Sequence, residues 1–115
     1  MATISAGAAL GTAPPAPTIT PTVQGTGGED LRGTISLGTG TVPAAGNVAA
    51  VTFAEALNQI PTVIVEPASQ PADGFEWGVN VVTNTGFFVT VGAALAASQP
   101  LGTYVLEYEV LEQPG

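Results

Sequence analysis

The stretch FEWGVNVVTNTGFFVTV, residues 75–91, indicates the fold more clearly than any other part of the chain. Its two halves alternate between apolar and small or polar residues with a period of two, which is typical of strands whose faces meet different surroundings. Between them, Asn84 and Gly86 supply the left-handed conformations that a tight hairpin turn requires. We therefore predict a β-hairpin. The inward side chains of its second strand are expected to be Phe87, Val89 and Val91.

The first strand of this hairpin places large side chains on one face. These are Phe75, Trp77, Val79 and Val81. We expect Trp77 to belong to the core, although a tryptophan at a sheet surface can also form a platform on which a sugar stacks. Phe88, in the second strand, is left on the outer face and needs a partner there.

Upstream of the hairpin, three further strands are predicted. LRGTISLGT, residues 31–39, alternates with period two, and a second strand is expected at 48–53. PTVIVEP, residues 61–67, is rich in β-branched residues and reads as a strand buried on both faces or as an inner sandwich strand. AEALNQ, residues 54–59, is predicted to form a short helix, while ASQPADG, residues 68–74, is predicted to be a polar loop.

Downstream of the hairpin, we expect a loop over 92–102 and a final strand in TYVLEYEVLE, residues 103–112. This strand would point Tyr104, Leu106, Tyr108 and Val110 inward and leave Val105, Glu107, Glu109 and Leu111 outside. Six closely spaced strands with at most one short helix predict an all-β fold. The alternatives are an antiparallel β-sandwich and a jelly-roll-like barrel.

The first 28 residues contain no charged side chain and four prolines, which excludes a helix and favours an extended, polyproline-like segment. A disordered tail is one interpretation. Because apolar residues are spread along it, we favour an arm that becomes ordered on another protein surface. The predicted organisation is an arm over 1–28, a glycine-rich hinge, and a β-sandwich domain over 29–115. The residues expected to contact a partner are Ile4, Leu10, Pro14, Pro15, Pro17, Ile19, Pro21, Val23 and Arg32.

Composition excludes several classes of function. The 115 residues include neither cysteine nor histidine, so disulfides, thiolate nucleophiles and histidine-based triads are ruled out. Nine acidic residues against one basic residue give a net charge of -8, which disfavours nucleic acid and anionic membranes as partners. No apolar run approaches the roughly 18 residues of a membrane-spanning helix. We expect no cofactor.

A few side chains are candidates for chemistry. Glu107 and Glu109 share a strand face and could form an acid and base pair, although solvated surface acids are the simpler interpretation. Asp73 and Glu76 could contribute oxygen ligands to calcium, without the regular spacing of a calcium loop. Arg32, the only basic residue, is expected to pair with Glu29, Asp30 or a carboxylate of a partner. We do not expect an enzyme.

One family resemblance rests on four motifs. GTISLGTGT at 33–41, VTFAEA at 51–56, IPTVIVEP at 60–67 and TNTGFFV at 83–89 resemble a domain of tailed-bacteriophage virion proteins, over about Leu31 to Val91. The motifs are strand and turn signals rather than chemistry. The resemblance implies a β-sandwich of the kind found in head decoration (cement) proteins, head fibres, and tail-fibre or minor tail proteins.

Among these, the resemblance leads us to expect a capsid decoration protein. A chain that begins with Met and an uncharged arm fits a stand-alone accessory protein, and the arm could cross boundaries between capsid subunits. The expected partners are the major capsid protein and further copies of the chain in a homotrimer, on the outer surface of the capsid, after synthesis in the host cytoplasm. The alternative is a tail-fibre or minor tail module that recognises a host glycan through Trp77 and loop residues.

Overall fold

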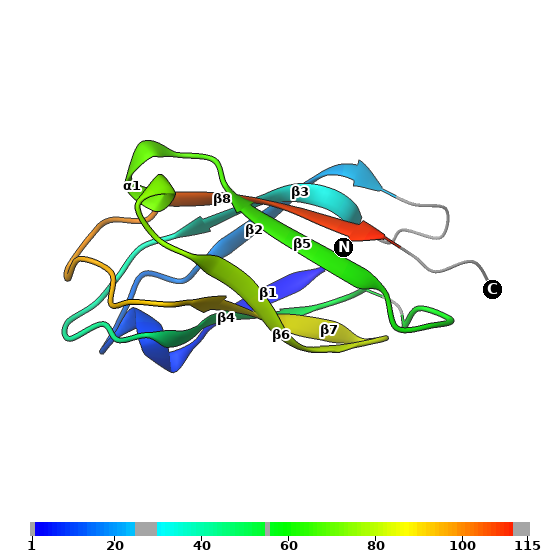
Figure 1. Cartoon of the computed structure of the whole chain (residues 1–115), viewed down its shortest axis with the longest axis horizontal. Helices are drawn as coiled ribbons and strands as arrows, with labels where there is room; N and C mark the ends of the chain where they lie inside the picture. Colours follow the sequence, from blue (N-terminus) through cyan, green and yellow to red (C-terminus); the bar gives the residue numbers. More distant parts are fainter. Residues whose placement is uncertain (1, 25–29, 55, 112–115) are drawn as a thin grey trace.

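The structure, a computed structural model, is an antiparallel sandwich of two four-stranded sheets (Figure 1). It describes residues 2–24, 30–54 and 56–111, with residues 21–24, 30 and 31 described by their backbone alone. Sheet I has the strand order β1-β4-β7-β6, formed by Thr3–Ala6, Gly46–Thr52, Gly86–Val91 and Trp77–Thr83. Sheet II has the order β2-β3-β8-β5, formed by Thr18–Gln24, Asp30–Leu37, Tyr104–Leu111 and Thr62–Pro67. The predicted all-β sandwich is confirmed.

The core lies between the two sheets, where the apolar positions of the alternating strands meet. Ile35, Leu106 and Val89 are completely buried there, and the inward side chains predicted for β7 and β8 are all buried. On β8, Glu107 and Leu111 are exposed and Val105 and Glu109 are partly exposed, so the predicted alternation of this strand is confirmed. Burial of these apolar side chains is the main favourable term in folding.

The hairpin of β6 and β7 forms as predicted, but its turn does not use the predicted left-handed conformations, since neither Asn84 nor Gly86 has a positive φ. The hairpin also has one irregularity. The pairing shifts register between Asn80 and Thr83, and Val81 has a φ of 47°. This bulge turns Val81 outward, where it is 58% exposed, while Val82 packs against the core instead. The expectation that Val81 points inward was therefore wrong, because an extra residue in one strand reverses the alternation beyond it.

Strand β5 is an edge strand rather than a strand covered on both faces. Val63 and Val65 are buried, whereas Ile64 between them is 42% exposed. Its one neighbour in the sheet is β8, and its inward side contacts β6 of sheet I. The continuous apolar run of this strand thus does not mean burial on both faces, which was one of the predicted alternatives.

The short helix lies in a different place from the predicted one. Among the described residues of 54–59, none is helical; the backbone N–H of Leu57 instead donates to Asn84, which ties this loop to the hairpin. Helix α1, Gln70–Asp73, forms in the segment predicted to be a loop. Ser69 precedes it in an extended conformation and Pro71 stands in its first turn, where a missing N–H costs nothing.

The N-terminal segment is part of the sandwich, contrary to the expected arm outside the core. Strand β1 pairs with β4, and β2 pairs with β3, so the segment adds one edge strand to each sheet. Between them lies the 3-10 turn η1, Ala8–Leu10, in which Leu10 is completely buried. Pro21 is tolerated in β2 because an edge strand can lose a backbone donor. The predicted hinge falls largely on residues 25–29, outside the described residues.

Candidate functional site

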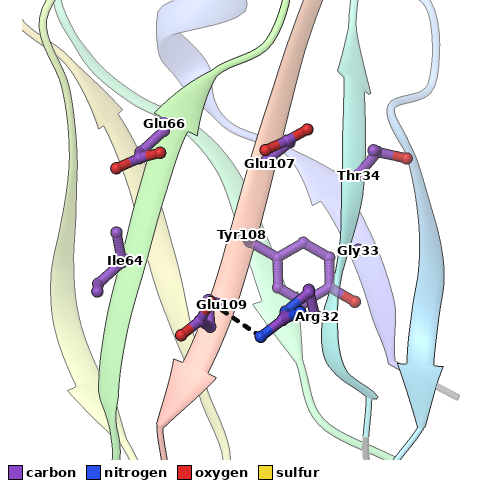
Figure 2. A pocket seen from close by; sticks show the side chains of 8 residues that line it. All are labelled: Arg32, Gly33, Thr34, Ile64, Glu66, Glu107, Tyr108 and Glu109. Carbon is purple, nitrogen blue, oxygen red and sulfur yellow. Dashed lines mark ion pairs between the residues drawn. The ribbon is translucent and has the colours of Figure 1, made fainter.

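A shallow hollow of about 250 Å³ lies on the outer face of sheet II, across β3, β8 and β5 (Figure 2). We call this surface the charged face; its charged residues are Arg32, Glu66, Glu107 and Glu109. The alternation of three neighbouring strands brings these side chains together, since every second residue points away from the core. Ile64 and Thr34 complete the rim of the hollow.

Arg32 forms an ion pair across two strands of this face. Its Nη2 lies 3.4 Å from Oε2 of Glu109, because the register of β3 and β8 sets the two residues directly opposite each other. Glu109 was not among the predicted partners, which were Glu29, Asp30 and a partner's carboxylate; the side chains of Glu29 and Asp30 lie outside the described ones. The two side chains are 60% and 37% exposed, so water screens the pair and its contribution to stability is at most about 1 kcal/mol.

The other two carboxylates of the charged face stand against each other. Glu66 on β5 is directly opposite Glu107 on β8, an arrangement of like charges that destabilises a sheet. Both side chains are exposed. Glu107 and Glu109, the predicted acid and base pair, lie two residues apart on this same open face of β8. The geometry favours solvated acids over a catalytic pair.

The predicted calcium ligands do not assemble into a metal site. Asp73 ends α1 and Glu76 lies three residues further on, just before β6. Among the residues that the structure describes, no group of three His, Cys, Asp or Glu side chains could hold a metal ion.

Trp77 is partly buried and packs against the core, where the sequence predicted a core residue. Its ring centroid lies 6.3 Å from those of both Phe75 and Tyr104, in tilted and edge-on contacts that aromatic rings prefer. The indole Nε1–H donates to the carbonyl oxygen of Ala72 in α1, at 2.8 Å. With its polar atom and neighbouring rings used in this way, Trp77 fits the core better than a sugar-stacking platform.

At one end of the sandwich, three segments pack closely against one another; we call this the loop end, formed by residues 7–17, 38–45 and 92–103 (Figure 1). Thr12 and Thr41 exchange backbone hydrogen bonds, and Ser98 donates to Gly40. A Cβ at Gly40 would overlap the carbonyl oxygen of Thr12, so only glycine lets the first two segments approach this closely.

Thr39 fastens the second and third segments of the loop end together. It is 3% exposed, and its hydroxyl donates to the carbonyl oxygen of Ala96 at 2.6 Å. The same hydroxyl accepts from the backbone N–H of Gln99 at 2.9 Å. Tyr104 adds a further link, because its phenolic oxygen accepts from the N–H of Ala96. Satisfied buried hydrogen bonds of this kind make a loop cluster rigid.

The backbone of the loop end is strained in all three segments. Ala13, Val42 and Ser98 have φ angles of 51°, 56° and 56°, values that side chains with a Cβ rarely adopt. Such conformations cost about 1–3 kcal/mol each and persist where the surrounding structure imposes them, often at binding sites. The three segments are therefore held in one defined shape.

The surface of the loop end is uncharged and partly apolar. None of its three segments contains an acidic or basic residue. Val42 is 82% exposed and Leu101 is 42% exposed, beside a shallow hollow of about 460 Å³ between the segments. Asp73 and Glu76 belong to the neighbouring segment, whose Glu76 carbonyl accepts from the N–H of Gly92. Acidic groups therefore adjoin the loop end without occupying it.

The predicted contact residues do not form one surface. Leu10 and Pro17 are buried, and Ile4 and Ile19 pack half-buried against the core. Pro14 and Pro15 lie half-buried in the loop end, whereas Arg32 is on the charged face. The side chains of Pro21 and Val23 lie outside the described ones. Val42 and Leu101 were missed, because GTGTVPAAGN and ASQPLG look like ordinary turns; a valine in a Gly/Pro-rich loop was the available signal.

Comparisons of the chain with family models, with curated proteins and with solved structures find no match. Among the described residues, no helix is both long enough and apolar enough to cross a membrane.

Proposed function

We propose that this protein is a structural component of a tailed-bacteriophage virion: a decoration protein that binds the outer surface of the head and stabilises it. Its partners are the major capsid protein and further copies of itself, in the expected homotrimer. The proposal starts from the motifs over residues 33–89 and is supported by the antiparallel sandwich, which is the fold that the resemblance implies.

The main observation that supports the proposal is the surface of the loop end. A chain of net charge -8 presents there a rigid, uncharged surface with two exposed apolar residues, Val42 and Leu101. A surface fixed before binding loses little conformational entropy when it docks, which favours a lasting protein contact. Contact with the capsid, which was first predicted for an N-terminal arm, is therefore proposed for the loop end, to which residues 7–17 contribute.

Binding of this kind stabilises the head by mass action. A protein that binds the assembled shell and not its separated subunits stabilises the assembled state by a free energy that grows with the logarithm of its concentration relative to its Kd. Mass spectrometry of purified virions tests the location directly. Hundreds of copies per particle are expected for a decoration protein, whereas a handful would indicate a tail tip, and absence from the virion would end the proposal.

A matched pair of variants tests the loop end itself. Val42→Asp places a charge on the proposed contact, and Ile60→Asp makes the same kind of change in the loop before β5, outside the loop end. Ile60 is 60% exposed, so neither substitution disturbs the core. Heads stripped of the protein are mixed with each variant, and the bound protein is measured after sedimentation.

We expect Val42→Asp to weaken attachment at least tenfold and Ile60→Asp to leave it within about twofold, since a desolvated unpaired charge costs more than 1.4 kcal/mol. Equal attachment of both variants would remove the loop end from the mechanism while leaving the virion location open to the mass measurement.

A further inference from the structure

The outer face of sheet I carries no charge, and we call it the neutral face. Its four strands, all of whose residues the structure describes, contain no acidic or basic side chain. The register lines up Ser5, Ala50, Phe88 and Asn80 across β1, β4, β7 and β6, and Thr3, Thr52, Gly86 and Thr83 in the next row. The neutral face thus contrasts with the charged face of sheet II, where three of the nine acidic residues gather.

Two features of the neutral face lie at the same hollow. Phe88 lies half-buried between Ala50 and Asn80, at the side of a hollow of about 210 Å³. Val81, turned outward by the bulge in β6, stands at the rim of the same hollow with 58% of its surface exposed. One surface therefore offers both an exposed apolar side chain and a place where one could be received.

The distribution of charge over the two outer faces indicates which kind of partner the neutral face fits. A basic protein would gain most on the charged face, where Glu66, Glu107 and Glu109 lie. A second copy of this chain is itself acidic, so contact through the charged face would bring carboxylates of both copies together. Contact through the neutral face brings together no carboxylate of its own four strands and keeps the charged faces apart. The face thus fits another copy of the same chain.

We propose that copies of this chain associate through the neutral face, with Val81 of one copy packed against the hollow beside Phe88 of another. This inference deepens the proposed self-association by naming its surface, and it rests on the proposed function only for the presence of a homo-oligomer. Strands about 4.8 Å apart, each about six residues long, give a face of about 400 Å². That is near half of the roughly 800 Å² per partner of a standard interface, so we expect a weak, concentration-dependent assembly.

The test is the mass of the purified full-length protein, measured by sedimentation equilibrium over a range of concentrations. Thr52→Glu adds a carboxylate at the hollow, and Thr20→Glu makes the identical change on the outer face of sheet II. Both threonines are exposed strand residues, so both variants should fold. Thr52→Glu is expected to weaken association at least tenfold, while Thr20→Glu changes it less than threefold.

Val81→Asn separates loss of association from loss of folding. Asparagine adopts positive φ more readily than valine, so this variant should unfold no more easily than the parent protein. Its association should nevertheless weaken, because the apolar side chain has gone. A parent protein that stays monomeric up to millimolar concentration, or an assembly that neither Thr52→Glu nor Val81→Asn weakens, would overturn the inference. Head attachment is measured separately, so the two proposals can fail independently.

Discussion

Sheet I and sheet II share one core but differ on the outside. Toward the core, both present buried apolar side chains, such as Val89 in β7 and Leu106 in β8. Toward the exterior, the neutral face of sheet I has threonine, serine, alanine and phenylalanine, whereas the charged face of sheet II has three glutamates and an arginine. Alternation along the strands allows this separation, since each face of a sheet can be specified without changing the other.

This difference shows that the inner and outer faces of each sheet have separate roles. The inner faces fix the fold, because burying them stabilises one pairing of strands over its slipped alternatives. The outer faces determine which surroundings each sheet tolerates. A face with like charges directly opposite each other is suited to water, and a face without charge can be covered at little electrostatic cost.

The largest expected effect is at Leu10, which lies between the two edge strands that the N-terminal segment contributes. Leu10→Ala removes a completely buried side chain, and we expect it to lower the free energy of unfolding by about 2–5 kcal/mol. Urea unfolding followed by the fluorescence of Trp77, the single tryptophan, measures this. Val42→Ala, at an exposed position, is the control. If Leu10→Ala lowers the free energy of unfolding by less than about 1 kcal/mol, the N-terminal segment would instead fit the predicted arm outside the core.

The strands that the sequence predicted correctly are those with a clear alternation and turn residues at both ends. The β6–β7 hairpin and β8 are examples, because the turn residues Asn84 and Gly86 and the alternating inward residues of β8 are local signals. Strands β1 and β2 were missed because proline and the absence of charge suggest an extended segment, and nothing in the segment tells whether a sheet edge is available to receive it. That information lies in β3 and β4.

The candidate sites depended even more on distant residues. Arg32 meets Glu109 through the pairing of β3 with β8, and the loop end joins residues near 12, 40 and 98. No local pattern specifies which strands become neighbours, so the pairing of Arg32 with Glu109 was not predicted. The bulge that exposes Val81 was hidden for a related reason, since a register shift is a property of two strands together.

A pair of core variants tests whether the two sheets depend equally on the shared interior. Val89→Ala in β7 and Val110→Ala in β8 each remove two buried methyl groups from a central strand. We expect each to cost on the order of 2 kcal/mol, because transfer and cavity terms are alike at the two positions. Thermal or urea unfolding provides the measurement. A difference of more than about 2 kcal/mol between the variants would mean that one sheet dominates the core.

The smallest expected effects distinguish the outer faces. Arg32→Gln removes the cation beside Glu109 and should lower stability by about 0.2–1 kcal/mol at low salt. Glu66→Gln has the opposite sign, because it relieves the repulsion from Glu107 directly across the strand pair, and should raise stability by a similar amount. Urea unfolding of dilute protein at about 0.01 M and about 1 M salt measures both changes.

Salt is the decisive variable, since the screening length falls from about 30 Å to about 3 Å over this range and both effects should shrink together. Thr52→Gln is the neutral-face control, an exposed polar change whose effect should not vary with salt. If the effects of Arg32→Gln and Glu66→Gln have opposite signs and both shrink at high salt, the salt-dependent interactions lie on the charged face of sheet II. If the effect of Thr52→Gln varied with salt as much as those of Arg32→Gln and Glu66→Gln, charges outside the strands would have to act on both faces alike. The contrast between the two faces would then no longer support a partner on sheet I.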